Sequence, residues 1–252
     1  MALDHPLYHD IERLLRRSAA GARRGAGKLA ASLGELESKP WDDSFRAWIA
    51  DAKRQGKDPN DVGDERWGDA RVGAEKRYLP LMDAGSVVLE LGPGTGRYTR
   101  HFISRCKELV LVDYSKVVCR WLEEYLQGKG TFRVVHARDY ALADVADGSI
   151  DVVIANGVFE HIYLEGFYHY LVTFARVMKP GARGCVNFNN ILSEGGFRHF
   201  KEKLPSGMDQ RSIFRFYHPQ TVEKLCREAG LAVVSVDTSD HRFAFLTFAK
   251  PA

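Results

Sequence analysis

The chain has 252 residues, of which 45% are hydrophobic and 27% charged, and its formal net charge is +3. This length and composition are typical of a globular protein with one α/β domain and extensions, and the small charge argues against nucleic acid or an anionic membrane as partner. No apolar stretch approaches the ~20 residues of a membrane span, the N-terminus has no signal-peptide core, and the four cysteines form no C-x-x-C pair. We therefore expect a cytoplasmic, reduced protein without a membrane span.

The first 66 residues predict a helical extension or cap that precedes the main domain at residues 67–252. Residues 6–33 place apolar side chains at spacings of three and four and arginines on another side, which is typical of an amphipathic helix with a solvated basic face. Residues 41–49 carry three aromatic side chains that predict a second short helix. The polar, turn-rich residues 54–66 predict a linker or mobile loop.

The chain is organised around residues 87–99, Val-Val-Leu-Glu-Leu-Gly-Pro-Gly-Thr-Gly-Arg-Tyr-Thr. The apolar run at the start predicts a buried parallel strand. Glu90 and three glycines follow, at Gly92, Gly94 and Gly96. Glycines allow a sharp turn and a close approach of a ligand to the backbone, and the helix that begins after them directs unpaired N–H groups toward the loop.

Strand and helix patterns alternate around this loop, which predicts an α/β fold with a doubly wound, mainly parallel sheet. The further predicted strands are 109–113, 131–135, 150–155, 183–188, 231–236 and 243–249. The predicted helices are 69–81, 115–126 with Ser115 as N-cap, 168–178 and 219–229, and residues 190–212 are expected to be rich in loops. Because the last two strands follow each other directly, we expect them to form an antiparallel hairpin at the sheet edge.

The glycine-rich loop resembles motif I of the class I S-adenosylmethionine-dependent methyltransferases, (E/D)-x-G-x-G-x-G, and all four defining positions match. The dinucleotide fingerprint G-x-G-x-x-G fits less well. The resemblance covers roughly residues 69–250, and the predicted elements follow the order of that family. It implies a seven-stranded sheet with the last strand antiparallel, S-adenosylmethionine as cofactor and S-adenosylhomocysteine as product.

The resemblance also implies which residues bind the cofactor. Glu90 and the three glycines are expected beside or behind the methionine end of the cofactor, and Asn156 and Gly157 beside its methionine portion. Asp113 and Tyr114 are expected at the ribose and adenine, and Asp139 and Tyr140 at the adenine. Asp113 ends the second strand, where an ionised carboxylate can accept hydrogen bonds from both ribose hydroxyls. Arg138 replaces the glycine that usually precedes the adenine-binding aspartate.

The residues after the fourth and fifth strands restrict the acceptor chemistry. Asn156-Gly-Val-Phe159 lacks the prolines of the (D/N)-P-P-(Y/F) motif of base amino-group methyltransferases. A catechol-type Mg²⁺ site needs carboxylates at these strand ends, but Asn156, Asn189 and Asn190 are neutral amides. We therefore expect no metal.

His161 is the candidate catalytic residue. The sequence Val158-Phe-Glu-His-Ile162 resembles the V-(L/F)-E-H-(I/V) segment of small-molecule methyltransferases, and a histidine near neutral pKa can act as a base. The alternative is that His161 caps or packs a short helix.

We expect methylation of a hydroxyl or carboxyl oxygen on a small molecule, with a homodimer left open. An N- or C-methyltransferase, an aminopropyltransferase and a non-catalytic cofactor-binding subunit are the alternatives. Deletion of residues 1–60 is expected to leave a core that binds cofactor but loses turnover.

Overall fold

The computed structural model describes residues 41–204 and 213–252. The chain divides into two compact units, Met1–Trp41 and Asp42–Ala252, and the architecture below is that of the second unit. The helix predicted over residues 6–33 lies outside the described residues. The predicted division of the chain after residue 66 stays a prediction.

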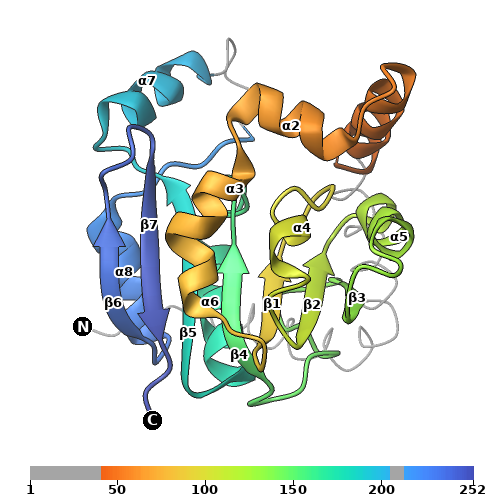
Figure 1. Cartoon of the computed structure of the whole chain (residues 1–252). Coiled ribbons are helices and arrows are strands. Elements are labelled where there is room, and N and C mark those ends of the chain that lie inside the picture. The colour runs from red at the N-terminus through yellow and green to blue at the C-terminus, as the bar shows by residue number, and fades with distance from the viewer. Residues whose placement is uncertain (1–40, 205–212) are drawn as a thin grey trace, which may run out of the picture. The chain divides into compact units, whose positions relative to one another are not determined.

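A seven-stranded sheet forms the centre of the second unit, in the order β3-β2-β1-β4-β5-β7-β6 (Figure 1). The five strands from β3 to β5 are parallel, and β7 is antiparallel to both of its neighbours, β5 and β6. This confirms the predicted doubly wound fold and the edge hairpin. The strands are β1 Val87–Leu91, β2 Glu108–Asp113, β3 Phe132–His136, β4 Ile150–Ala155, β5 Met178–Asn189, β6 Ala232–Asp237 and β7 Phe243–Ala249.

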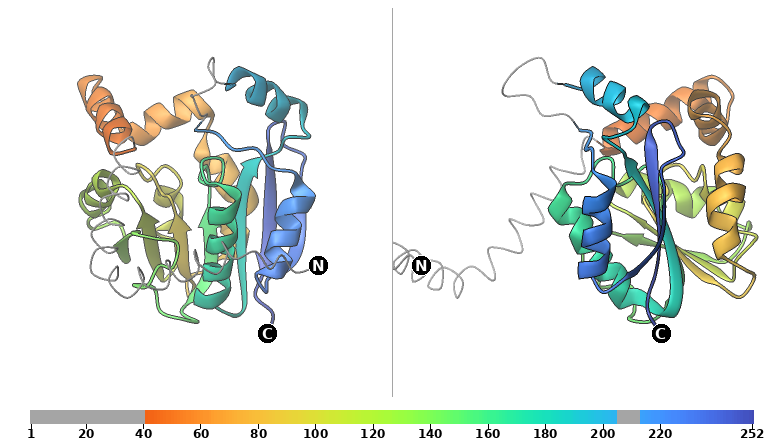
Figure 2. Two further views of the ribbon diagram at one scale, coloured as in Figure 1. Left: turned by 180° about the vertical axis from the view of Figure 1, so that it is seen from behind. Right: turned by 90° about the vertical axis from the view of Figure 1, so that its left-hand side faces the viewer.

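Helices cover both faces of the sheet, as the edge-on view of Figure 2 shows. On one face lie α3 (Ala70–Gly73), the π-helical turn η1 (Ala74–Tyr78) and the 3₁₀ turn η2 (Leu79–Leu81), followed by α4 (Thr99–Phe102) and α5 (Lys116–Tyr125). On the other lie α6 (Leu164–Val177) and α8 (Pro219–Glu228). Alternate strand residues serve the two layers: Leu89 packs in the core on the α6 side and Val88 in the core on the α5 side.

Three helical elements lie beyond the carboxyl ends of the parallel strands, at the top of Figure 1. They are the segment 42–54, α2 (Pro59–Trp67) and α7 (Glu194–Glu202). The first confirms the predicted second helix. The predicted linker over 54–66 is wrong, because most of it is α2, and the prediction of a loop-rich 190–212 missed α7.

Both missed helices begin at a side-chain cap. Asp58 accepts a hydrogen bond from the backbone N–H of Asn60, with Pro59 at the first position of α2. Ser193 accepts one from the N–H of Gly196 in α7. Within the described ranges, no helix is both long and apolar enough to cross a membrane.

Candidate active site

The glycine-rich loop leaves β1 in a conformation that side chains oppose. Gly92 has φ +65°, and a Cβ at this position would lie 2.4 Å from Cγ2 of Val158. Gly94 has φ +57°, and a Cβ there would lie 3.5 Å from the ring of Phe45 in segment 42–54. Both backbone conformations favour glycine. The loop is therefore bare main chain at these positions, and Val158 and Phe45 pack directly against it.

Asp113 lies at the carboxyl end of β2 and is only 8% exposed. Its Oδ1 accepts a hydrogen bond of 2.8 Å from the backbone N–H of Ser115, the N-cap of α5. Burial raises the pKa of Asp113 to about 7, against the opposing effect of backbone hydrogen bonds from Ser115, Gly94 and Tyr114. A carboxylate held in this way, beside the bare loop, suits a ligand that brings its own hydrogen-bond donors.

Segment 42–54 covers the start of α5 beside Asp113. Asp42 Oδ1 accepts a hydrogen bond from Ser115 Oγ and one of 3.3 Å from the N–H of Val117. Its charge also contributes to the raised pKa of Asp113. The N-terminal extension therefore contacts both the loop after β1 and the loop after β2, on either side of the predicted cofactor position.

Glu90 supports the loop from behind. Its side chain is 3% exposed and accepts a hydrogen bond of 2.7 Å from Oγ1 of Thr99 in α4. Burial raises the pKa of Glu90 to about 8, so the carboxyl is largely protonated at neutral pH. This arrangement suits a structural role beneath the loop.

The predicted adenine residues Asp139 and Tyr140 follow β3. The carboxylate of Asp139 accepts a hydrogen bond of 2.9 Å from the N–H of Ala141, within its own turn. The ring of Tyr140 packs on α6, with ring centroids 5.6 Å from His169 and 5.0 Å from Tyr170. Their assignment to the adenine stays a prediction.

The loop after β4 carries Asn156 and Gly157. Asn156 Oδ1 accepts a hydrogen bond of 2.8 Å from the hydroxyl of Tyr78, a buried residue of η1. The N–H of Gly157 donates to Oδ1 of Asn187 at 2.7 Å. Since a backbone N–H only donates, this contact fixes which end of the Asn187 amide faces it. No local pattern in the sequence marked Asn187, because its partner follows a different strand.

His161 follows on the same loop. Its Nδ1 lies 3.2 Å from the carbonyl oxygen of Ile213, and its ring centroid is 5.0 Å from that of Phe214. A carbonyl only accepts, so Nδ1 carries the hydrogen of the neutral ring and Nε2 is the basic nitrogen. Burial lowers the pKa of His161, against the raising effect of Glu160. The ring is therefore neutral at physiological pH, as a proton acceptor must be.

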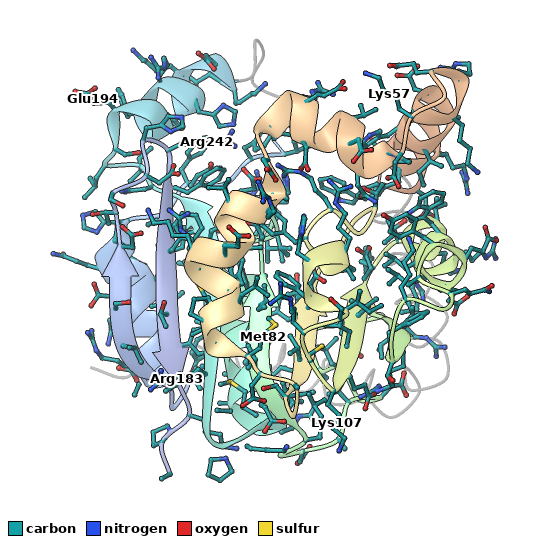
Figure 3. All side chains as sticks on the ribbon, in the orientation of Figure 1. Lys57, Met82, Lys107, Arg183, Glu194 and Arg242 are labelled. Atoms are coloured by element: carbon teal, nitrogen blue, oxygen red, sulfur yellow. The ribbon has the colours of Figure 1, made fainter. Side chains whose placement is uncertain are left out.

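Glu160 and Arg242 connect this loop to the β6–β7 hairpin. Arg242, labelled below α7 in Figure 3, donates from Nη2 to Oε2 of Glu160 at 2.6 Å and from Nε to Oδ1 of Asn189 at 2.9 Å. Glu160 Oε1 is 3.8 Å from Nε2 of His161. The network joins the carboxyl ends of β4 and β5, and sequence reasoning missed Arg242 because the contact spans 82 positions.

The three amides at the ends of β4 and β5 are engaged within the protein, and the expectation that they bind no metal stays a prediction. Tyr78 and Arg242 occupy the oxygens of Asn156 and Asn189, as described above, and Asn190 Oδ1 accepts from the N–H of Leu192 at 3.0 Å. Within residues 41–204 and 213–252, one cluster has metal-ligand geometry: Asp64, Asp69 and His101. The Asp64 oxygens accept hydrogen bonds from Arg97 and Arg100, which disfavours a cation there.

Comparison with known proteins identifies the central part of the chain. Residues 89–186 match the family profile described as a methyltransferase domain. An uncharacterized methyltransferase from Geobacillus kaustophilus is 26% identical over 121 residues, which cover 48% of this chain and 55% of the relative. This segment, which runs from β1 into β5, is therefore similar to methyltransferase domains. The chain spans about half the length of this curated relative.

Solved structures support the fold of this methyltransferase domain. A chain from the complex between the Haloferax volcanii Trm112 methyltransferase activator and a methyltransferase superposes with a TM-score of 0.60 at 19% identity, covering 82% of this chain and 98% of that one. An S-adenosylmethionine-dependent methyltransferase from Aquifex aeolicus gives 0.55 at 15% identity, covering 72% and 89%. The [4+2]-cyclase SpnF gives 0.55 at 16% identity, covering 73% and 80%.

The cofactor of such a domain is S-adenosylmethionine, and the described residues fit it. Gly92 and Gly94 present main chain only, and the Asp113 carboxylate can accept hydroxyl hydrogens. Arg97, the residue after Gly96, is bound to Asp64 and to the carbonyl of Gly68.

Proposed function

We propose that this protein transfers the methyl group of S-adenosylmethionine to an oxygen atom, of a hydroxyl or carboxyl group, on a small-molecule acceptor. The observation that carries the proposal is the His161 ring beyond the end of β4, with Nδ1 engaged by the Ile213 carbonyl and Nε2 as its basic nitrogen. A hydroxyl acceptor must lose its proton, and a positioned neutral histidine is a common base for that step.

The proposed roles of the other residues follow from their contacts. S-adenosylmethionine supplies an electrophilic methyl group. Asp113 accepts hydrogen bonds from the ribose hydroxyls, and the main chain of the glycine-rich loop approaches the methionine end. Asn156 and Gly157, held by Tyr78 and Asn187, form the boundary between cofactor and acceptor. Glu160 stabilises the His161 ring when it takes up a proton, because its carboxylate lies 3.8 Å from Nε2.

The small net charge of +3 favours a small molecule over a nucleic acid as acceptor. The fold by itself leaves the reaction open, since SpnF, a [4+2]-cyclase, shares it. The acceptor atom therefore needs a direct test.

Binding is tested by calorimetric titration with S-adenosylhomocysteine and NAD. We expect saturable binding of S-adenosylhomocysteine and none of NAD; the opposite pattern would remove the basis of the proposal. The acceptor atom is tested with S-adenosylmethionine carrying a labelled methyl group and pools of phenols, carboxylic acids and amines. Label should enter the oxygen acceptors, and transfer to amines alone would reject O-methylation.

A further inference from the structure

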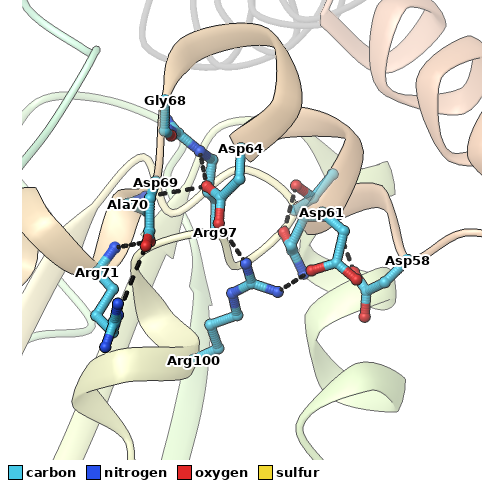
Figure 4. A network of polar contacts seen from close by, with 11 residues as sticks. Asp58, Asp61, Asp64, Gly68, Asp69, Ala70, Arg71, Arg97 and Arg100 are labelled. Carbon is cyan, nitrogen blue, oxygen red and sulfur yellow. Dashed lines mark hydrogen bonds and ion pairs between the residues drawn. The ribbon is translucent and has the colours of Figure 1, made fainter.

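The glycine-rich loop is bonded to α2, a helix that precedes the methyltransferase domain. Arg97, the residue after the last glycine of the loop, donates from Nε to Oδ1 of Asp64 at 2.6 Å and from Nη2 to the carbonyl of Gly68 (Figure 4). Arg100, one turn further in α4, donates from Nη2 to Oδ2 of Asp64 at 2.5 Å. One carboxylate of α2 therefore binds two side chains that follow the loop.

A second bond holds the middle of the loop. Thr95 Oγ1 donates to Oδ1 of Asn60 at 2.7 Å, and both residues are buried, with 1% and 0% exposure. The Thr95 carbonyl accepts from Nε1 of Trp121 in α5 at 2.8 Å. We call the contacts of Asn60, Asp64 and Gly68 with Thr95, Arg97 and Arg100 the loop anchor.

The loop anchor differs from an ordinary surface ion pair. The side chains of Asp64, Arg97 and Arg100 are 18%, 16% and 23% exposed, and Asp64 is hydrogen-bonded at both oxygens. Charge-assisted bonds in such surroundings are stronger and less screened by salt than exposed pairs. Burial raises the pKa of Asp64, but the bonds from Arg97 and Ala70 and the charges of Arg97 and Arg100 outweigh it and lower the pKa.

The loop needs such support because of its own backbone. Its three glycines have positive φ and no side chains that could pack. The free chain therefore loses much conformational entropy when this shape is fixed. A site that is already held in its binding shape does not lose that entropy when the ligand arrives.

We propose that Asp64 is a positioning residue for cofactor binding, which acts by holding Arg97 and Arg100 and thereby fixes the glycine-rich loop in its binding conformation. The inference rests on the proposed function, in that it takes the loop to be part of the cofactor site. It assigns a role in cofactor affinity to α2, a helix that precedes the seven-stranded sheet in the chain.

The test compares Asp64→Asn with Asp51→Asn in the full-length protein. Asp51 pairs with Arg54 in segment 42–54, where both side chains are exposed, so the control removes the same charge from an ordinary surface pair. The affinity for S-adenosylhomocysteine is measured by calorimetry, and the thermal midpoint is measured without ligand. Hydrogen exchange of the ligand-free protein reports on residues 92–97 and, for comparison, on β4.

We expect Asp64→Asn to weaken S-adenosylhomocysteine binding by about tenfold, or about 1.4 kcal/mol, and to speed exchange at residues 92–97 while β4 keeps its protection. Asp51→Asn should change neither. Asp64→Glu, which keeps the charge, should retain most of the affinity. If Asp64→Asn yields too little folded protein, Thr95→Val, which removes the Asn60 bond, should give the same pattern in weaker form.

Unchanged affinity and unchanged loop exchange in Asp64→Asn would overturn the proposal. So would faster exchange spread evenly over the protein, since that is the signature of lost global stability alone. If the wild-type protein fails to bind S-adenosylhomocysteine, the proposed function is wrong, and the exchange experiment still decides whether Asp64 holds the loop.

Discussion

At the scale of single residues, the buried carboxylate of Asp113 destabilises the ligand-free fold when it is ionised, and the same ionised form is suited to accept hydrogen bonds from a ligand. Its pKa is about 7 in the folded protein, because it is buried, and 3.8 is the ordinary value. Between these two pH values the folded state binds more protons than the unfolded state, so the stability of the ligand-free protein falls as pH rises. Hydroxyl donors of a ligand would favour the ionised form and reverse this cost.

The first prediction is that S-adenosylhomocysteine binds more tightly as pH rises through about 7 and that binding releases a proton. Asp113→Asn should weaken binding by about 1.5–3 kcal/mol and remove the pH dependence, because the acceptor charge is lost. The same variant should raise the thermal midpoint of the ligand-free protein at pH 8. Calorimetry in buffers of different ionisation enthalpy measures the proton release. A lower midpoint with unchanged affinity would make Asp113 a structural residue.

The second prediction concerns His161. A base in the transition state contributes about 10²–10⁴-fold in rate, so His161→Ala should reduce turnover by that factor and leave S-adenosylhomocysteine affinity nearly unchanged. Since burial lowers the pKa of His161, the wild-type rate should fall only at pH values below its ordinary 6.5, and the variant should lose this inflection. Added EDTA should change little. A fully active His161→Ala would identify a packing histidine, and loss of activity with EDTA that Mg²⁺ restores would require a metal.

Sequence reasoning predicted those parts of the candidate site that are local in the chain. The glycines, Asp113 and His161 could be named because a strand end fixes where the next residues lie. Asn187 and Arg242 could not, because their roles come from pairing across strands, with Gly157 and Glu160 as partners.

At the scale of elements, the glycine-rich loop and the loop after β4 are packed against each other. A Cβ on Gly92 would lie 2.4 Å from Cγ2 of Val158, and φ at Gly92 is +65°. The two loops therefore fix each other's position, and a residue larger than glycine would separate them.

The third prediction is that Gly92→Ala weakens S-adenosylhomocysteine binding strongly and lowers the thermal midpoint. A strained left-handed alanine costs about 1–2 kcal/mol, and the displaced Val158 adds to it. Gly128→Ala is the matched control, since it has φ +72° but nothing within 4 Å of its Cβ position. Equal effects of the two variants on affinity would show that backbone strain, and not the contact with Val158, is what matters.

The helices that were missed show what the sequence lacks. α2, PNDVGDERW, has no apolar periodicity, because it is held by its cap at Asp58 and by the ion pairs of Asp64. α7 contains Gly195 and Gly196, which lower helix propensity, but a Cβ at these positions would lie 2.3 Å from the carbonyl oxygen of His241 and 1.9 Å from that of Asn190. These glycines are required by tertiary contacts, which a local pattern does not reveal. The strands were predicted well because buried parallel strands are continuous apolar runs.

At the scale of the whole molecule, residues 42–68 are bound to the sheet domain through the loops after β1 and β2. Asp42 and Phe45 contact the loops after β2 and β1, and α2 provides the loop anchor. The expectation that residues 1–60 can be deleted without loss of cofactor binding therefore has to be revised, since that deletion removes Asp42, Asp58 and Asn60. The α2 residues of the loop anchor begin at Asn60, and the contacts of segment 42–54 described above begin at Asp42. None of these described contacts therefore needs residues 1–40.

The last prediction compares two truncations. Deletion of residues 1–40 leaves segment 42–54 and α2 in place, so the product should fold and bind S-adenosylhomocysteine within about threefold of the full chain, or about 0.7 kcal/mol. Deletion of residues 1–68 removes both elements and leaves Arg97 and Arg100 without their carboxylate partners. Because the loop anchor is lost with α2, the glycine-rich loop is no longer held in its binding shape, so this product should bind at least about tenfold more weakly and melt at a lower temperature. Calorimetry and thermal denaturation of the two products decide it: equal affinities would show that the sheet alone holds the glycine-rich loop, and loss of folding in the shorter deletion would place residues 1–40 in the core.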